Sequence, residues 1–187
     1  YDTQENVLKD VSFTAQQGEV TALIGPSGGG KTTVSRLASR FWDIKKGCIC
    51  VGGMDIAKID PETLMQLYSI VFQDVTLFNN TIMENIRIGR QDATDEEVIR
   101  AAKTVCAHDF IMQMEDGYQT QVNERGSRLS VGQRQLISFA RALLADPAIL
   151  ILDEATSSID TETEIVLQEG LNHLLKGRTS FIIAHRL

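Results

Sequence analysis

The sequence predicts an α/β fold with a largely parallel sheet, because short apolar segments alternate along the chain with segments of helical periodicity. Two regions carry this prediction. Residues 148–152 are five consecutive apolar residues, as in a strand buried on both faces of a sheet. An apolar, β-branched segment at 19–25 runs into a glycine-rich loop, after which apolar residues recur with the spacing of a helix.

The remaining elements follow from local patterns. Strands are expected at 19–25, 48–51, 69–72, 148–152 and 179–184. Helices are expected at 31–40, from Pro61, from the acidic run 94–97, from Ser130 to Pro147, and over the leucine repeat that ends at Gly177. The helical stretch between Gln73 and Pro147 reads as an insertion on one side of the sheet. Phe41 and Trp42 are expected in the core.

Length and composition narrow the classes of function. A chain of 187 residues with 43% apolar content fits one domain with a real core. Its net charge of −7 disfavours non-specific binding to nucleic acid, which depends on Lys and Arg. No apolar stretch approaches the roughly 20 residues that span a bilayer. The three cysteines, Cys48, Cys50 and Cys106, predict reduced thiols in a reducing cytosol. His108 and His173 are interpreted as surface or structural residues.

The loop from Gly25 to Thr32 predicts a phosphate-binding site. It fits the pattern G-x-x-x-x-G-K-[ST] and stands between an expected strand and an expected helix. Glycines let backbone N–H groups turn toward phosphate oxygens, and the helix N-terminus adds partial positive charge. Lys31 is expected to reach the β- and γ-phosphates and the Thr32 hydroxyl to bind Mg²⁺. The expected nucleotide contacts here are Gly25, Pro26, Ser27, Gly28, Gly29, Gly30, Lys31, Thr32 and Thr33.

Two carboxylates follow the buried strand at 148–152. Asp153 and Glu154 would lie at the carboxyl edge of the sheet, where open α/β sheets bind ligands. Asp153 is expected to hold Mg²⁺, and Glu154 to act as general base toward the attacking water. Farther back in the chain, Ser130 and Gln133 fit a capping box at a helix start, whose N–H groups form a second expected anion site.

These motifs, in this order, resemble the nucleotide-binding domain of an ABC transporter, most closely of the exporter (multidrug or lipid A) type. Residues 25–32 resemble the Walker A motif, 149–153 with Glu154 resemble Walker B and the catalytic glutamate, and 129–133 resemble the L-S-G-G-Q signature. Gln73, Asp160 and His185 fall at the Q-loop, D-loop and switch histidine, and residues 120–126 resemble an exporter segment. Tyr1 stands where the family has an aromatic residue that stacks on adenine.

The resemblance implies a P-loop NTPase core with a mostly parallel sheet, an N-terminal antiparallel β part and an inserted α-helical subdomain. Residues 1–73 and 147–187 would form the ATPase core, and about 74–146 the helical subdomain. The chain would be a fragment of one ABC domain whose C-terminal end is missing.

The family mechanism implied is ATP hydrolysis by two such domains facing head to tail. Lys31, Gln73, Glu154 and His185 would be catalytic, and Thr32, Gln73 and Asp153 would hold Mg²⁺. The opposite domain's site would be contacted by Ser130, Gly132, Gln133 and Asp160. The partners would be a transmembrane domain and a second ATP-binding domain, on the cytoplasmic side of the cell membrane, with no nucleic acid.

Four residues in three motifs depart from the family pattern. Val131 replaces a glycine of the signature, and because a β-branched residue resists positive φ, we expect ordinary helix there. Asn123 replaces a glycine in the exporter segment, and Ser158-Ile159 replaces Ala-Leu in the D-loop.

Two alternatives remain. A soluble ABC protein, a nucleotide-gated clamp in DNA repair or translation, shares every core motif. A P-loop kinase or GTPase is disfavoured by the Ser130 signature, Gln73 and His185.

Overall fold

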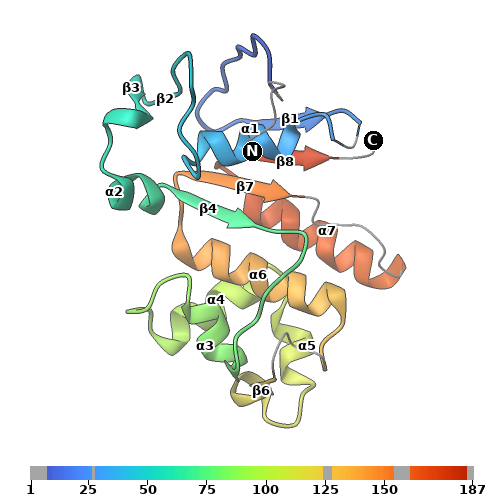
Figure 1. Ribbon diagram of the computed structural model, residues 1–187. Helices are drawn as coiled ribbons and strands as arrows, with labels where there is room; N and C mark the ends of the chain where they lie inside the picture. Colours follow the sequence, from blue (N-terminus) through green and yellow to red (C-terminus); the bar gives the residue numbers. More distant parts are fainter. Residues whose placement is uncertain (1–7, 27, 124–127, 154–160, 185–187) are drawn as a thin grey trace.

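Four parallel strands form the main sheet of the computed structural model, which describes residues 8–26, 28–123, 128–153 and 161–184 (Figure 1). Their order across the sheet is β1 (Val20–Ile24), β8 (Thr179–Ala184), β7 (Ile149–Asp153) and β4 (Tyr68–Val71). All three pairings are parallel, so the predicted α/β class is confirmed. The strand expected at 179–184 has those bounds in the structure.

Helices in the segments that connect the strands cover the sheet. α1 (Lys31–Ala38) packs against β8, and α6 (Val131–Ala145) packs against β4 and α7 (Thr161–Leu175). In Figure 1, α6 and α7 lie on the same side of the sheet. β7 is the most buried strand, with Leu150, Ile151 and Leu152 at most 1% exposed, as its continuous apolar run predicted.

A small β unit connects α1 to β4. β2 (Cys50–Val51) and β3 (Met54–Asp55) pair antiparallel, followed by the 3₁₀ helix η1 (Ile56–Lys58) and by α2 (Pro61–Gln66). Asp60 caps α2 by accepting a hydrogen bond from the Thr63 N–H, and Pro61 takes the first helical position, as expected. The strand expected at 48–51 is therefore shorter than predicted, because only its last two residues find a partner strand.

The segment between β4 and β7 is mainly helical and packs around α6. Its elements are β5 (Asn80–Thr81), α3 (Ile82–Arg87), α4 (Asp95–Thr104), α5 (His108–Met112), η2 (Gly117–Gln119), β6 (Gln121–Val122) and α6. α3 and α4 both contact α6, whose Ile137, Phe139 and Ala140 are fully buried. The division of the chain into an ATPase core and a helical subdomain is an interpretation of this arrangement.

Two expectations about burial are wrong. The strand predicted as buried at 19–25 is half exposed, with Val20 48% and Ile24 53% exposed. β1 lies at the edge of the four-stranded sheet, and the described chain covers only one of its faces. Phe41 and Trp42 were expected in the core but are 49% and 41% exposed, because α1 ends at Ala38 and the chain then leaves the packed layer. The Arg36 guanidinium lies 5.5 Å from the centre of the Trp42 ring, a cation–π contact.

Candidate nucleotide-binding site

The glycine-rich loop bends sharply between β1 and α1. Gly28 and Gly30 have φ values of 78° and 84°, in the left-handed region where a side chain is disfavoured. Gly30 is the N-cap of α1, and no side chain caps that helix. The first N–H groups of α1 therefore receive no side-chain cap from the N-cap residue and have no intrahelical partner. Because Pro26, Gly28 and Gly29 are exposed, the loop presents an accessible backbone surface suited to an anion.

Lys31 is held at this loop by the backbone. Its ammonium group donates to the carbonyl oxygens of Gly25, at 2.7 Å, and Pro26, at 2.8 Å. The residue is only 7% exposed. These contacts fix the cation beside the N-terminus of α1, so positive charge from the side chain and from the helix dipole act at the same place.

The pairing of the strands brings Asp153, at the end of β7, to the same edge of the sheet as the glycine-rich loop. β8 pairs Ala184 with Ile24 of β1 and Ile183 with Asp153 of β7, while Val71 of β4 pairs with Leu152. The four carboxyl ends are therefore level, and they point to the same side in Figure 1. Three predicted site residues lie at this edge. Gly25 follows β1, Asp153 ends β7, and Gln73 comes shortly after β4.

The chemistry of these donors fits Mg²⁺. Thr32 offers a hydroxyl, Asp153 a carboxylate and Gln73 an amide oxygen, all hard oxygen ligands of the kind Mg²⁺ prefers. Asp153 ends β7 at the carboxyl edge, and Thr32 lies in the first turn of α1 at the same edge. The residues present are therefore compatible with a magnesium–phosphate site.

The signature segment forms the predicted capping box at the start of α6. The Ser130 hydroxyl accepts from the Gln133 N–H at 3.1 Å, and the Gln133 side-chain oxygen accepts from the Ser130 N–H at 3.0 Å. Val131 is the first residue of α6 and is 48% exposed, so the expectation of ordinary helix at this departure from the family pattern is confirmed. α6 begins on the side of the molecule to which the strand ends point (Figure 1).

Gly132 is buried within the chain, against α7. A Cβ atom there would lie 2.2 Å from Thr163 Cγ2 and 3.5 Å from Leu167 Cδ1. The glycine therefore allows α6 and α7 to approach closely, a requirement that the sequence did not reveal.

A polar network anchors the segment that follows Gln73, and sequence reasoning missed it. Asn85, which is fully buried, accepts from the Phe78 N–H at 2.8 Å and donates to the carbonyls of Phe78 and Thr81, each at 3.0 Å. Arg141 of α6 donates to the Asn85 carbonyl at 2.9 Å and to the Thr76 carbonyl at 3.3 Å. Burial lowers the pKa of Arg141 from its usual value. The network ties residues 76–81 to α6.

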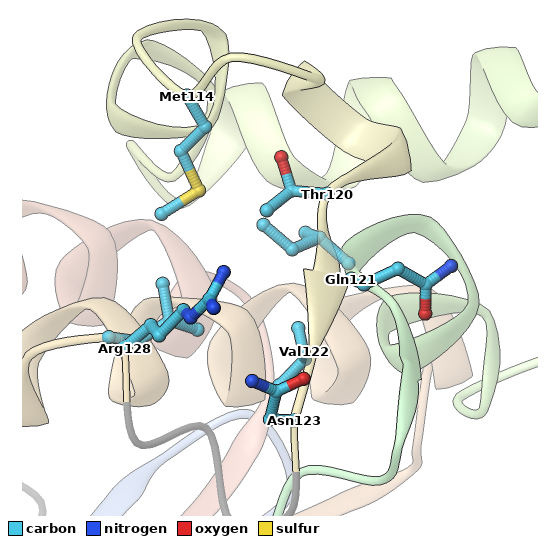
Figure 2. Close-up of a pocket in the computed structure, with 8 residues that line it drawn as sticks. Met114, Thr120, Gln121, Val122, Asn123 and Arg128 are labelled. Atoms are coloured by element: carbon cyan, nitrogen blue, oxygen red, sulfur yellow. The ribbon is translucent and has the colours of Figure 1, made fainter.

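A small hollow lies beside the exporter-like segment, away from the glycine-rich loop. Figure 2 shows Met114 and Thr120 on one side of it, with Asn123 and Arg128 across from them. Its floor includes Ile82, Val122 and Leu129, which are at most 6% exposed. Its lining therefore combines apolar side chains with polar ones.

Several predicted site residues fall outside the described part of the chain, namely Tyr1, Ser27, Glu154, Asp160 and His185, together with residues 124–126 of the exporter-like segment. Their roles stay predictions. Of the other two histidines, His108 Nδ1 lies 2.9 Å from the Tyr118 hydroxyl, consistent with the structural role expected for it. Burial raises the pKa of Tyr118 to about 12. Within the described residues, none of the helices combines the length and the apolar character needed to cross a membrane.

Comparison with known proteins identifies the family of this chain. The family described as "ABC transporter" matches residues 8–157. The chain belongs to the ABC transporter family. The resemblance drawn from the motifs is thereby confirmed, and with it the assignment to an ABC-type ATPase domain.

Two relatives of this ABC domain cover the whole chain. An uncharacterized ABC transporter ATP-binding protein, YknV of Bacillus subtilis, is 56% identical over 187 residues, and an ATP-dependent lipid A-core flippase of Legionella pneumophila is 50% identical over 187 residues. A solved structure of a bacterial Atm1-family ABC exporter with ATP bound is 42% identical, with a TM-score of 0.91 over the whole chain. The chain spans about a third of each relative, 31% of YknV, 32% of the flippase and 32% of the Atm1-family chain.

Proposed function

We propose that this chain binds ATP with Mg²⁺ and hydrolyses it to drive export across a membrane, as one of two ATP-binding domains in a transporter. The observation that carries the proposal is the α1 N-terminus: it has no side-chain cap, it starts at a left-handed glycine, and the Lys31 ammonium is fixed beside it. A helix start of this kind binds phosphate groups.

Different residues at the carboxyl edge of the sheet would bind the phosphates, hold Mg²⁺ and activate water. The N–H groups of the loop and Lys31 would bind the phosphates, while Thr32, Asp153 and Gln73 would hold Mg²⁺. Mg²⁺, when bound, would neutralise charge on the β- and γ-phosphates. Glu154 directly follows Asp153, so its carboxylate would act as general base toward water, and His185, directly after β8, would contact the γ-phosphate.

A second copy of the domain would complete the site. The phosphate loop is open to solvent, and the Ser130 end of α6 is exposed on the same side of the molecule. In a head-to-tail dimer, the Ser130 hydroxyl of one domain would face the phosphates bound at Lys31 of the other, and Asp160 would lie between the two sites. ATP would hold such a dimer together, and hydrolysis would release it.

The similarity to exporters supports the placement on a membrane transporter. The chain spans only about a third of its relatives, which leaves length for a transmembrane domain, and the ATP-binding domain would then lie on the cytoplasmic side. The alternative, a nucleotide-gated clamp, uses the same ATP site. Membrane-spanning segments encoded next to this domain in its gene would favour the transporter, and their absence would favour the clamp.

The test is Glu154→Gln, which removes the base and retains the shape of the side chain. ATP affinity should stay unchanged, while turnover should fall by about 10²–10⁴-fold, the usual contribution of general base catalysis. The variant should also form a dimer in ATP and Mg²⁺, measured by light scattering. Glu115→Gln, an exposed acid in the helical segment, is the matched control and should hydrolyse normally. Turnover of Glu154→Gln at the parent rate would refute the assignment of the base.

A further inference from the structure

A cysteine, a glutamate and a histidine meet where α4 and α7 approach each other. Cys106 Sγ, a carboxylate oxygen of Glu169 and a ring nitrogen of His173 all lie within 4.8 Å of one another. Cys106 follows α4, and the other two residues lie on α7. From the sequence, Cys106 is predicted to be a reduced thiol and His173 a surface or structural residue, and the two are 67 positions apart in the printed sequence.

The backbone holds Cys106 in one orientation. It is one of the few non-glycine residues with left-handed backbone, with φ of 62°. Its N–H donates to the Lys103 carbonyl at 3.2 Å, and the Ala107 N–H donates to the Ala102 carbonyl at 2.8 Å. These two bonds form a Schellman motif at the end of α4, so the thiol projects from a fixed turn.

The distance between this turn and α7 is also fixed. Gly170 is buried, and a Cβ atom there would lie 2.4 Å from the Val105 carbonyl oxygen. The preceding residue, Glu169, is thereby brought against the turn that carries Cys106. His173 follows Glu169 by four positions, so the two side chains share one face of α7.

The chemistry of the cluster suits a metal ion. The thiol of Cys106 is partly buried, whereas Glu169 and His173 are exposed, which leaves an open side for entry and for a water ligand. Burial raises the pKa of the Cys106 thiol, and the negative carboxylates of Glu169 and Asp109 raise it further. Sulfur, imidazole and carboxylate together form a donor set suited to Zn²⁺ and unsuited to Mg²⁺.

The geometry points to a binding site for a divalent transition-metal ion, best matched by Zn²⁺, formed by Cys106, Glu169 and His173. Zn–S bonds of about 2.3 Å and Zn–N and Zn–O bonds of about 2.1 Å place tetrahedral ligands about 3.5 Å apart, which side-chain rotations reach from the present separations. On binding, the thiol proton is released to solvent and the thiolate sulfur bonds the metal, while water takes the fourth position. The site is separate from the proposed ATP site and does not depend on it.

The experiment uses Co²⁺ as a spectroscopic probe, without nucleotide, in a Cys48→Ser/Cys50→Ser background. Cys106 is then the only thiol in the printed sequence. One Co²⁺ per chain should bind with a thiolate-to-cobalt charge-transfer band, and Zn²⁺ should displace it while excess Mg²⁺ should not. Adding Cys106→Ser should abolish the band. A band that persists in that variant, displacement by Mg²⁺, or no band in the background protein would overturn the site.

Ligand variants test the other two donors. Glu169→Gln and His173→Gln should each weaken Zn²⁺ binding, measured by calorimetry, by at least about tenfold, the lower end of the loss seen even for residues outside the ligand set. Glu164→Gln removes the same charge from another exposed position on α7 and should bind Zn²⁺ as the background does. Circular dichroism checks that each variant is folded. As a second measurement, Zn²⁺ should slow alkylation of Cys106 in the background protein, and an unchanged alkylation rate would count against the site.

Discussion

The N-termini of α1 and α6 are built in opposite ways, although the sequence assigns both to the binding of phosphate. α1 begins at Gly30, in left-handed backbone and without a side-chain cap. α6 begins at Ser130, in extended backbone, with both hydrogen bonds of a capping box. The first N–H groups of α1 therefore remain available to a ligand. At α6, by contrast, the capping box already bonds some of the N-terminal N–H groups.

Because of this difference, the N-termini of α1 and α6 are suited to bind phosphate through different groups. In the predicted capping box the Gln133 N–H donates to Ser130, so this N–H group is already used at the start of α6. The Ser130 hydroxyl accepts that bond, and a hydroxyl that accepts still has its own O–H to donate. α1 is therefore suited to bind phosphate through its backbone, and α6 through one side chain.

The largest expected effect is at α1, from Lys31→Ala. Loss of the ammonium group removes a charge-assisted phosphate contact worth about 1.5–3 kcal/mol, so ATP affinity should fall by about 10- to 100-fold. Binding of a fluorescent ATP analogue measures this. Lys58→Ala, which removes an exposed lysine of η1, is the control and should bind normally. Unchanged affinity in Lys31→Ala would remove the main difference between the two helix starts.

A smaller effect is expected from Gly132→Ala in α6. The added Cβ would lie 2.2 Å from Thr163 Cγ2, and crowding of this kind lowers the free energy of unfolding by about 1–3 kcal/mol. Urea denaturation measures the loss. Adding Thr163→Ser removes the methyl group and keeps the hydroxyl, so the double variant should recover most of the stability. Equal stability of the single and double variants would show that Gly132 has another role.

The smallest effect is expected from Ser130→Ala. Loss of the cap should lower the free energy of unfolding by about 1 kcal/mol. ATP-dependent dimerisation should weaken as well, since the same hydroxyl would face the partner's phosphates. Thr94→Ala is the matched control, because Thr94 and Glu97 form a capping box at α4, which has no proposed ligand. Thr94→Ala should cost similar stability and leave dimerisation intact, and equal dimerisation by both variants would remove the proposed role of Ser130.

Features set by neighbouring residues could be predicted from the sequence. The glycine-rich loop, the capping box at Ser130 and the acidic start of α4 depend on residues within a few positions, and the strand at 179–184 is marked by its own apolar, β-branched composition. The order of strands and loops also places Asp153 and Lys31 at one edge, because the carboxyl ends of parallel strands lie together.

Features that depend on distant contacts could not be predicted in this way. Arg141 and Asn85 are 56 positions apart, and nothing local to either residue marks the bond between them. The close packing of Gly132 on Thr163 depends on how α6 and α7 meet, and the exposure of Trp42 on where α1 ends. The roles of Glu154 and His185 come from the motif alone and await the kinetic test.

The position of β8 sets the width of the proposed ATP site. β8 lies between β1 and β7, so the strand that leads into the glycine-rich loop and the strand that ends at Asp153 do not touch each other. Neighbouring strands are about 4.8 Å apart, which puts the axes of β1 and β7 about 10 Å apart. Backbone hydrogen bonds on both sides of β8 maintain this spacing whatever side chains the strand carries. β8 therefore fixes the distance between the ends of β1 and β7, from which the glycine-rich loop and Asp153 reach the proposed site.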